Sequence, residues 1–259
     1  MLGSGYAEHP GGKGLNQAVS ASRSGANTAF VGALGDDAAG VRLRGVLAAE
    51  SIDATAVTIV DVPTGRALIT VDDEGENSIV VIPGANATVS SDIVLPSARV
   101  VLAQLEIPID AVVAALVGAK STGSIVILNP APAAPLPPEL VAACDVIVPN
   151  EHELVQLGGA AAVLAAGCAA VVATLGADGA DVSTDRGTTR VESFAVEPID
   201  TTGAGDAFCG ALAARLAAGD GLLDAVRWAT AAGALATTVH GAVPAQPTAE
   251  AIEALITNH

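Results

Sequence analysis

The chain has 259 residues, of which 51% are hydrophobic and only 2% are aromatic. This length is enough for one large domain with a sizeable core, with or without a small appendage. The formal net charge of −17 at pH 7 argues against nucleic acid or an anionic membrane as a partner. It does not exclude ATP, because local hydrogen-bond donors and a metal ion can outweigh the charge of the whole molecule.

Three features indicate a soluble protein of the cytoplasm. The cysteines Cys144, Cys168 and Cys209 are scattered, match no zinc spacing and suit a reducing compartment. The N-terminus lacks the basic region and apolar run of a signal peptide. Residues 159–177 are apolar, but Gly167 divides them into an alanine-rich helix and a valine-rich strand, which favours a buried pair over a membrane span.

The first part of the chain predicts alternating helices and strands, followed by a hairpin. We expect helices at 13–24 and 37–50 and strands at 28–32 and 54–60. Residues 64–71 and 77–82 then flank an acidic turn at 72–76, a pattern typical of a β-hairpin with no helix between its strands. On the pattern alone, this hairpin could be an extra edge of the main sheet.

Short apolar runs follow, of the kind expected for parallel strands covered on both faces, at 100–104, 124–128, 145–148 and 170–174. Helical segments separate them at 108–120, 137–143 and 151–158. Glu106, Asn129 and Asn150 come directly after strand ends, where an open α/β sheet binds its ligands. An antiparallel pair at 180–196 and helices at 222–240 and 248–257 complete the chain. The pattern therefore predicts one α/β domain with a doubly wound, mostly parallel sheet and helices on both faces.

The segment from Asp200 to Asp206 carries the strongest chemical signal. It follows a strand-like run at 190–196 and opens an alanine-rich helix at 207–218. Two Thr supply capping oxygens, and the glycines let backbone amides approach an anion such as phosphate. Asp206 would repel that phosphate unless it accepts a proton from a hydroxyl that attacks the phosphoryl group. From these residues alone, a capped helix without any ligand is an equally good interpretation.

Other polar residues have structural and functional interpretations side by side. Gly12, Lys13 and Asn16 lie at the start of a helix, yet no Ser or Thr follows Lys13, so a phosphate loop is rejected and a plain turn remains open. Asn150 and Glu153 match a capping box. The segment 174–179 is typical of an ordinary glycine turn, and Glu106 taken alone is typical of a solvated loop acid.

Five segments in order resemble the signatures of the ribokinase-like (PfkB-type) sugar kinases: 11–18, 104–106, 129–133, 149–153 and 200–206. The resemblance runs from about Leu2 to the C-terminus. It implies a ribokinase-like α/β domain over 1–259, with lid strands at about 1–11, 64–72 and 77–83 closing over the sugar. It implies ATP-dependent phosphorylation of the 5-hydroxyl of D-ribose. Another pentose or nucleoside, such as 2-deoxyribose, and a non-catalytic sugar or nucleotide binder remain alternatives.

The resemblance also assigns roles to residues. It implies that Asp206 is the catalytic base and also contacts the sugar. The other implied roles are phosphoryl stabilisation by Gly203, Ala204 and Gly205; sugar binding by Gly12, Lys13, Asn16 and Glu106; and binding of ATP and Mg²⁺ by Asn150, Glu153, Thr174, Gly176, Gly179, Gly205 and Thr230. Glu153 would act on Mg²⁺ through bound water. The histidines are scattered, and none is given a catalytic role.

A K⁺ site and a homodimer through the lid are implied as well. The implied cation ligands are Asp200, Thr202, Ala236, Val239, Gly241 and Ala245. Ala245 stands where the family often has Ser, so one side-chain ligand is missing.

The family has a first parallel strand, an Asn-x-Asp turn whose acid binds the sugar and one lid strand before the region that matches from Leu2. We expect either that the protein begins upstream, or that the chain folds with an open sugar site and pairs its bare sheet edge with a partner chain. In the second case we expect it to bind ATP but to handle ribose poorly.

Overall fold

The computed structural model describes residues 5, 7–71 and 77–259. Its largest sheet has six strands in the order β10-β9-β8-β7-β6-β5. Four strands are parallel: β5 (Val100–Ala103), β6 (Ile125–Leu128), β7 (Val146–Ile147) and β8 (Ala170–Thr174). The last two, β9 (Ala180–Thr184) and β10 (Gly187–Val191), pair antiparallel at one edge. The mostly parallel sheet is confirmed: its four parallel strands fall within the predicted apolar runs, and β9 and β10 within the antiparallel pair predicted at 180–196.

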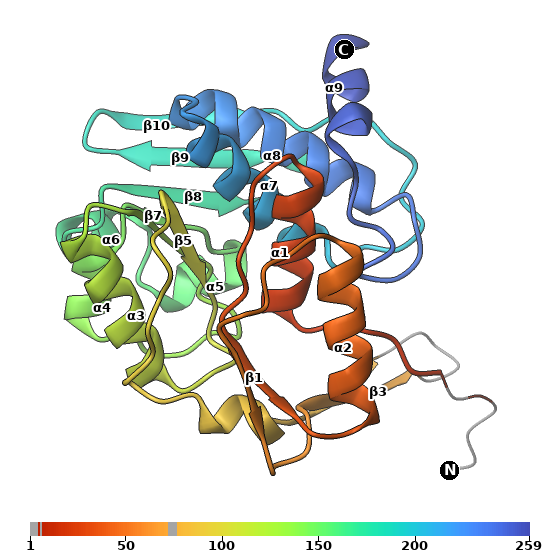
Figure 1. Ribbon diagram of the computed structural model, residues 1–259. Coiled ribbons are helices and arrows are strands. Elements are labelled where there is room, and N and C mark those ends of the chain that lie inside the picture. Colours follow the sequence, from red (N-terminus) through yellow and green to blue (C-terminus); the bar gives the residue numbers. More distant parts are fainter. Residues whose placement is uncertain (1–4, 6, 72–76) are drawn as a thin grey trace.

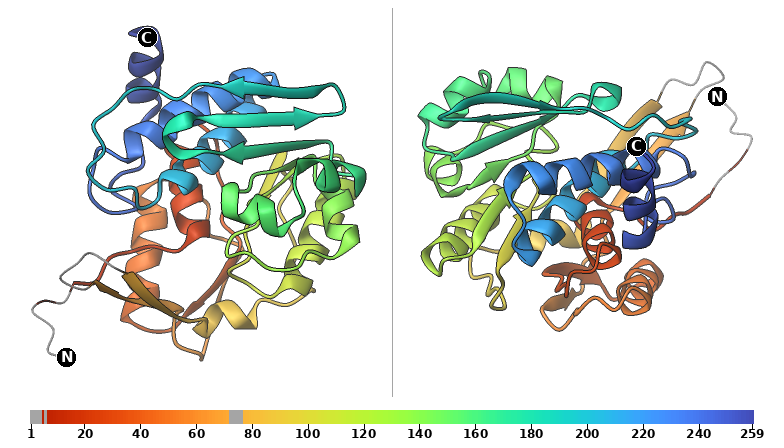
Figure 2. Two further views of the ribbon diagram at one scale, coloured as in Figure 1. Left: turned by 180° about the vertical axis from the view of Figure 1, so that it is seen from behind. Right: turned by 90° about the horizontal axis from the view of Figure 1, so that it is seen from above.

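Helices cover both faces of this sheet, as predicted (Figures 1 and 2). Side chains alternate along each strand, so Val126 and Leu128 face one layer while Ile127 faces the other. The first layer packs on α3 (Ile109–Ser121), α4 (Pro138–Ala143) and α6 (Ala160–Ala165), near α5 (Glu151–Gln156). The second layer packs on α7 (Ala204–Ala218), α8 (Leu222–Ala236) and α9 (Ala249–Thr257). Within the described ranges, no helix is long and apolar enough to span a membrane.

The N-terminal part forms a separate small sheet. Helices α1 (Lys13–Arg23) and α2 (Ala38–Ala49) accompany the parallel strands β1 (Gly32–Gly35) and β2 (Val57–Val60). The predicted strand at 28–32 is wrong in its bounds: it holds an isolated bridge at Ala29, and the ladder begins at Gly32. The reason is burial, because Ala33 and Leu34 are 6% and 5% exposed, whereas the residues just before them stay half-exposed. Over the described residues, β1 and β5 are edge strands of different sheets.

The predicted hairpin is a third sheet, made of β3 (Arg66–Val71) and β4 (Asn77–Ile82), and not an edge of the main one. Its acidic turn at 72–76 lies outside the described residues. The expected lid strand at 1–11 is not formed in its described part, since residues 5 and 7–11 have no strand assignment. Pro10 lacks an N–H for a ladder, and glycines at 11 and 12 disfavour a strand.

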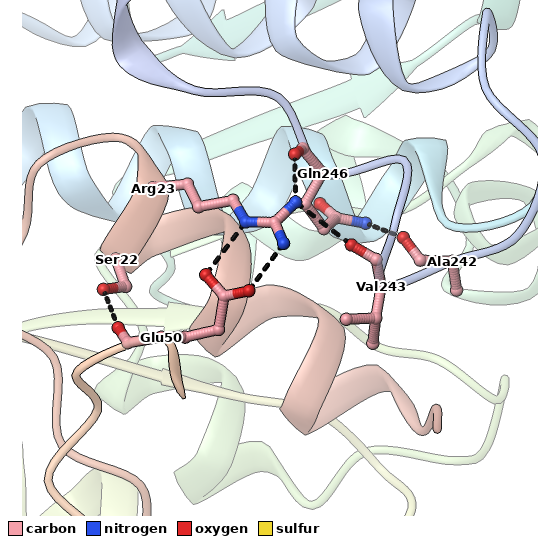
Figure 3. Close-up of polar contacts among 6 residues, drawn as sticks. All are labelled: Ser22, Arg23, Glu50, Ala242, Val243 and Gln246. Carbon is pink, nitrogen blue, oxygen red and sulfur yellow. Dashed lines mark hydrogen bonds and ion pairs between the residues drawn. The ribbon is translucent and has the colours of Figure 1, made fainter. Parts of the chain in front are cut away.

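Arg23, at the end of α1, joins three distant segments (Figure 3). Its guanidinium pairs with both carboxylate oxygens of Glu50, at 2.9 Å from Nε and 2.5 Å from Nη2. Nη1 donates to the backbone carbonyls of Gln246 at 2.6 Å and Val243 at 3.2 Å. The α1 helix is thus bonded directly to the segment that precedes α9, and bidentate geometry fixes the direction of these bonds.

Candidate functional site

The N-terminus of α7 is built on a glycine in the left-handed region. Gly203 is the N-cap residue with φ 79° and ψ 2°, and no side chain caps the helix. The expected capping by side-chain oxygens of the two Thr is therefore wrong, because the residue at the cap position is Gly203 and no side chain accepts from the first turn. The Thr202 backbone N–H donates to Asp200 Oδ1 at 2.9 Å. The helix begins at Ala204, three residues earlier than predicted, and the strand-like run before it ends at Val191. This earlier start places Asp206 in the first turn.

Asp206 is buried, with 7% of its surface exposed, and both carboxylate oxygens accept hydrogen bonds from α1. Asn16 Nδ2 donates to Oδ2 at 2.8 Å, and Gln17 Nε2 donates to Oδ1 at 2.9 Å. The two helices approach closely because Gly210 of α7 has no side chain: a Cβ there would lie 2.3 Å from the Gln17 carbonyl oxygen. Helix α1 therefore holds the carboxylate that the sequence singled out as a base.

A cavity of about 130 Å³ lies in front of this carboxylate. Several residues predicted from separate motifs meet there, and the lining residues are Lys13, Asn129, Ala131, Val148, Asn150, Glu153, Thr174, Gly203, Gly205, Asp206 and Cys209. The described residues supply no acceptor for the Gly205 N–H, whereas the Ala204 N–H donates to the Thr201 carbonyl at 3.2 Å. The exposed amide at Gly205, at the positive end of the helix dipole, suits an anion.

The predicted sugar residues Gly12, Lys13 and Glu106 form one corner beside the cavity. The Lys13 backbone N–H donates to Glu106 Oε2 at 2.8 Å, and a Cβ on Gly12 would lie 3.7 Å from the same oxygen. Burial raises the pKa of Glu106, against the opposing effects of the Lys13 amide and the Lys13 charge. Glu106 is thus a part-buried acid bonded to the start of α1, and not the solvated loop acid that it would be in isolation.

Asn150 and Glu153 form the capping box that their spacing predicted. Asn150 Oδ1 accepts from the Glu153 backbone N–H at 2.8 Å, and Glu153 Oε2 accepts from the Asn150 backbone N–H at 2.9 Å. Glu153 is 8% exposed and lines the cavity together with Asp206. Mg²⁺ prefers oxygen ligands and usually keeps several of its waters, so the Glu153 carboxylate in the wall of this cavity fits that ion.

The other predicted nucleotide residues are spread more widely. Thr174 lines the cavity, and Gly176 has open space around it with φ +58°. Packing alone requires glycine at position 179, because a Cβ there would lie 2.1 Å from the Val191 carbonyl oxygen. Thr230 is buried in α8 and bonds back to the Val226 carbonyl at 2.9 Å, away from the lining of the cavity.

The predicted cation residues come together only in part: Asp200 bonds Thr202 and Gly241, and Ala236 and Ala245 pack beside α7. Asp200 Oδ2 accepts from the Gly241 amide at 2.8 Å. This bond, with those from Thr202, lowers the pKa of Asp200 to about 2. Ala236 and Ala245 are buried at 0% and 3% exposure, whereas Val239 is 44% exposed.

Sequence reasoning assigned no site role to Gln17, Gln104 or Cys209, and it placed Asn129 at the ligand-binding edge of the sheet without a specific role. Gln17 is 1% exposed and bonds both Asp206 and Asn129 Oδ1, the latter at 3.1 Å. The only available signal was position, since Gln17 stands in the segment 11–18 and Asn129 directly follows a strand.

Comparisons with known proteins agree with this geometry. The family model described as pfkB family carbohydrate kinase matches residues 1–249. The ribokinase of Haemophilus influenzae is 39% identical over 267 residues, covering 96% of this chain and 87% of that protein. The crystal structure of ribokinase from Thermotoga maritima has a TM-score of 0.90 at 34% identity, covering 96% of this chain and 88% of that one. Arabidopsis thaliana ribokinase complexed with ribose and ATP has a TM-score of 0.88 at 30% identity, with coverages of 95% and 87%.

Proposed function

Because this chain belongs to the pfkB family of carbohydrate kinases, we propose that it transfers the γ-phosphoryl group of ATP to the 5-hydroxyl of D-ribose. The chain is a phosphotransferase with an alcohol group as acceptor. The observation that carries the proposal is the buried Asp206 carboxylate, which lies at the α7 N-terminus and lines the same cavity as Lys13 and Glu153.

In the proposed reaction, Asp206 accepts the proton of the sugar hydroxyl while the hydroxyl oxygen attacks the γ-phosphorus. The new oxygen–phosphorus bond forms as the bond to the β-phosphate oxygen breaks, and ADP leaves. The Gly205 amide and the α7 dipole stabilise the charge on the transferred group. The Gly203 amide, which likewise has no acceptor among the described residues, would share this role, whereas the Ala204 N–H would first have to leave the Thr201 carbonyl.

Magnesium would be held through water by Glu153, with Asn150 beside it, and would neutralise charge on the phosphates. The capping box supports this role because it fixes the Glu153 side chain before any ligand binds. Lys13 and Glu106 would bind sugar hydroxyls, and Thr174 and Gly176 would border the nucleotide. We also propose that the protein works in the cytoplasm, where ATP is available.

A coupled assay of ADP release tests this function. D-ribose should give the highest kcat/KM in a panel with 2-deoxyribose, other pentoses, fructose and adenosine. If another sugar gave the highest kcat/KM, that sugar and not D-ribose would be the substrate. If no sugar caused ADP release, the protein would be a non-catalytic binder of sugar or nucleotide.

Replacing K⁺ by Na⁺ at constant ionic strength should lower kcat roughly 3- to 10-fold, the effect of about 0.6 to 1.4 kcal/mol on the barrier. The reason is that Asp200 bonds both the Gly241 loop and Thr202 next to the anion site, so a cation there would set the geometry of both. The expected effect is small because Ala245 supplies no side-chain ligand to the cation. Equal rates in K⁺, Na⁺ and tetramethylammonium would contradict a functional cation site.

The lid hairpin supports a homodimer, because it exposes six large apolar side chains by 46 to 64%: Leu68, Ile69, Ile79, Val80, Val81 and Ile82. Leu68 lies opposite Val80 and Ile69 opposite Ile79, so apolar residues occupy both faces of the hairpin. One face would cover the sugar and the other would pack against a second copy.

Sedimentation velocity should show a dimer. Val80 and Val81 are neighbours in β4, so Val80→Lys and Val81→Lys each place a charge on a different face of the hairpin. The variant on the dimer face should give monomers, and the variant on the sugar face should weaken ribose binding. A monomeric wild-type protein would contradict the proposal.

A further inference from the structure

The two α1 amides that bond Asp206 differ in how firmly they are held. Asn16 is 5% exposed, and its Oδ1 is buried without a partner among the described residues. This oxygen can accept a hydrogen bond from a ligand hydroxyl. Gln17, by contrast, has a protein partner on both ends of its amide: Gln104 Nε2 donates to its Oε1, and Asn129 Oδ1 accepts from its Nε2.

These partners determine the orientation of the Gln17 amide. Because the Asp206 carboxylate can only accept, Nε2 must be the end that donates to Asp206 and Asn129, which leaves Oε1 to accept from Gln104. Asn129 is fixed in turn, since its Nδ2 donates to the Val148 carbonyl at 2.9 Å. A chain of buried hydrogen bonds therefore runs from the main sheet through Asn129 and Gln17 to Asp206.

We infer that Gln17 is a positioning residue for phosphoryl transfer: its locked amide holds the Asp206 carboxylate in the orientation that receives the sugar proton. This inference rests on the proposed function. The inference gives the two adjacent residues different roles: Asn16 can contact the sugar, and Gln17 only orients the Asp206 carboxylate. Since Gln17 has no polar atom left over for a ligand, its loss should change the rate of the chemical step and leave substrate binding intact.

The test is a double-mutant cycle with Gln17→Met, which keeps the length of the side chain and removes both polar ends. In the wild-type background, kcat should fall roughly 10- to 100-fold, while KM for ribose and for ATP changes less than about twofold. In the Asp206→Asn background, the same substitution should change kcat by less than about twofold, because there is no base left to orient.

Ser20→Ala is the matched control. Ser20 lies on the same helix and donates to the Ala207 carbonyl at 2.7 Å, so the variant loses a buried α1–α7 hydrogen bond that does not touch Asp206. It should lower Tm without changing kcat. A Gln17→Met enzyme that is folded and has wild-type kcat would overturn the inference, and so would an equal fold loss in both backgrounds.

Three further outcomes are distinguishable. If Gln17→Met does not fold, Gln104→Met replaces it, because this variant removes the hydrogen bond to Gln17 Oε1 and keeps Gln17 itself. It should lower kcat severalfold in the wild-type background and not in the Asp206→Asn background. An unchanged kcat would overturn the inference. If the wild-type protein releases no ADP with any sugar, the proposed function fails and the role of Gln17 fails with it. If wild type and Asp206→Asn behave as expected but the cycle is additive, only the role of Gln17 is refuted.

Discussion

Asp206→Asn should lower kcat by at least ~10²-fold, the usual scale for a lost general base. The substitution keeps the shape of the side chain but replaces an acceptor-only carboxylate with an amide that cannot take the sugar proton. The fold should persist, because the new amide oxygen can still accept from Gln17 Nε2, and Asn16 can turn its unpartnered Oδ1 toward the new NH₂ group. Initial rates of ADP release and calorimetric titration with ATP would measure the two effects separately.

The matched control is Asp224→Asn. Asp224 is an exposed acid in the first turn of α8, a helix of 15 residues like α7. Its replacement removes the same interaction between a carboxylate and a helix N-terminus, at a position that does not line the cavity. The kcat should therefore stay within a factor of two of wild type. An Asp206→Asn enzyme with turnover within a factor of two of wild type would remove Asp206 from the mechanism.

Gly210→Ala should lower the stability of the fold more than most single substitutions. The new Cβ would lie 2.3 Å from the Gln17 carbonyl oxygen and 2.5 Å from the Ser20 Cβ, and a backbone atom cannot move aside as a flexible side chain can. Overpacking of this kind costs about 3 kcal/mol. That corresponds to a loss of roughly 6 to 12 °C in Tm for a chain of this size. Scanning calorimetry would measure it, and kcat should fall as α1 moves away from Asp206.

Gly118→Ala is the control for Gly210→Ala, since Gly118 also lies inside a helix but has open space where the Cβ would go. There the alanine should raise stability by about 0.5 to 1 kcal/mol through helix propensity. If both variants raised Tm, the close crossing of α1 and α7 would be refuted.

Much of the fold could be predicted because local signals and tertiary packing agree. The continuous apolar run at 170–174 forms β8 over the same residues, and α9 (Ala249–Thr257) lies within the helix predicted at 248–257. Errors occur where packing overrides local pattern. Strand β1 lies where the chain is buried and not where Thr28 and Phe30 favour a strand, and α7 starts on a left-handed glycine where two Thr suggested a side-chain cap.

The candidate site was predictable in its parts but not in its connections. Asp206, Lys13 and Glu153 could be singled out because they stand in motifs with a clear chemical use. The hydrogen bonds of Gln17 could not, since its partners Gln104, Asn129 and Asp206 come from three distant segments. Nothing local distinguishes a glutamine that bonds a carboxylate 189 residues away from one that faces solvent.

The pairing of α1 with α7 has a consequence for how the protein is made. Asn16 and its partner Asp206 are 190 residues apart, so α1 leaves the ribosome long before the helix that buries it. At about 5 to 20 residues per second, the wait is roughly 10 to 40 s. During that time Gln17 and Ser20, both buried in the finished fold, have no α7 to bond, whereas Leu15 and Val19 can already pack against Leu47 and Ile52, which follow soon after α1. The polar face of α1 is therefore made long before its partner helix, and Asp206 meets Asn16 and Gln17 only after the main sheet has been synthesised.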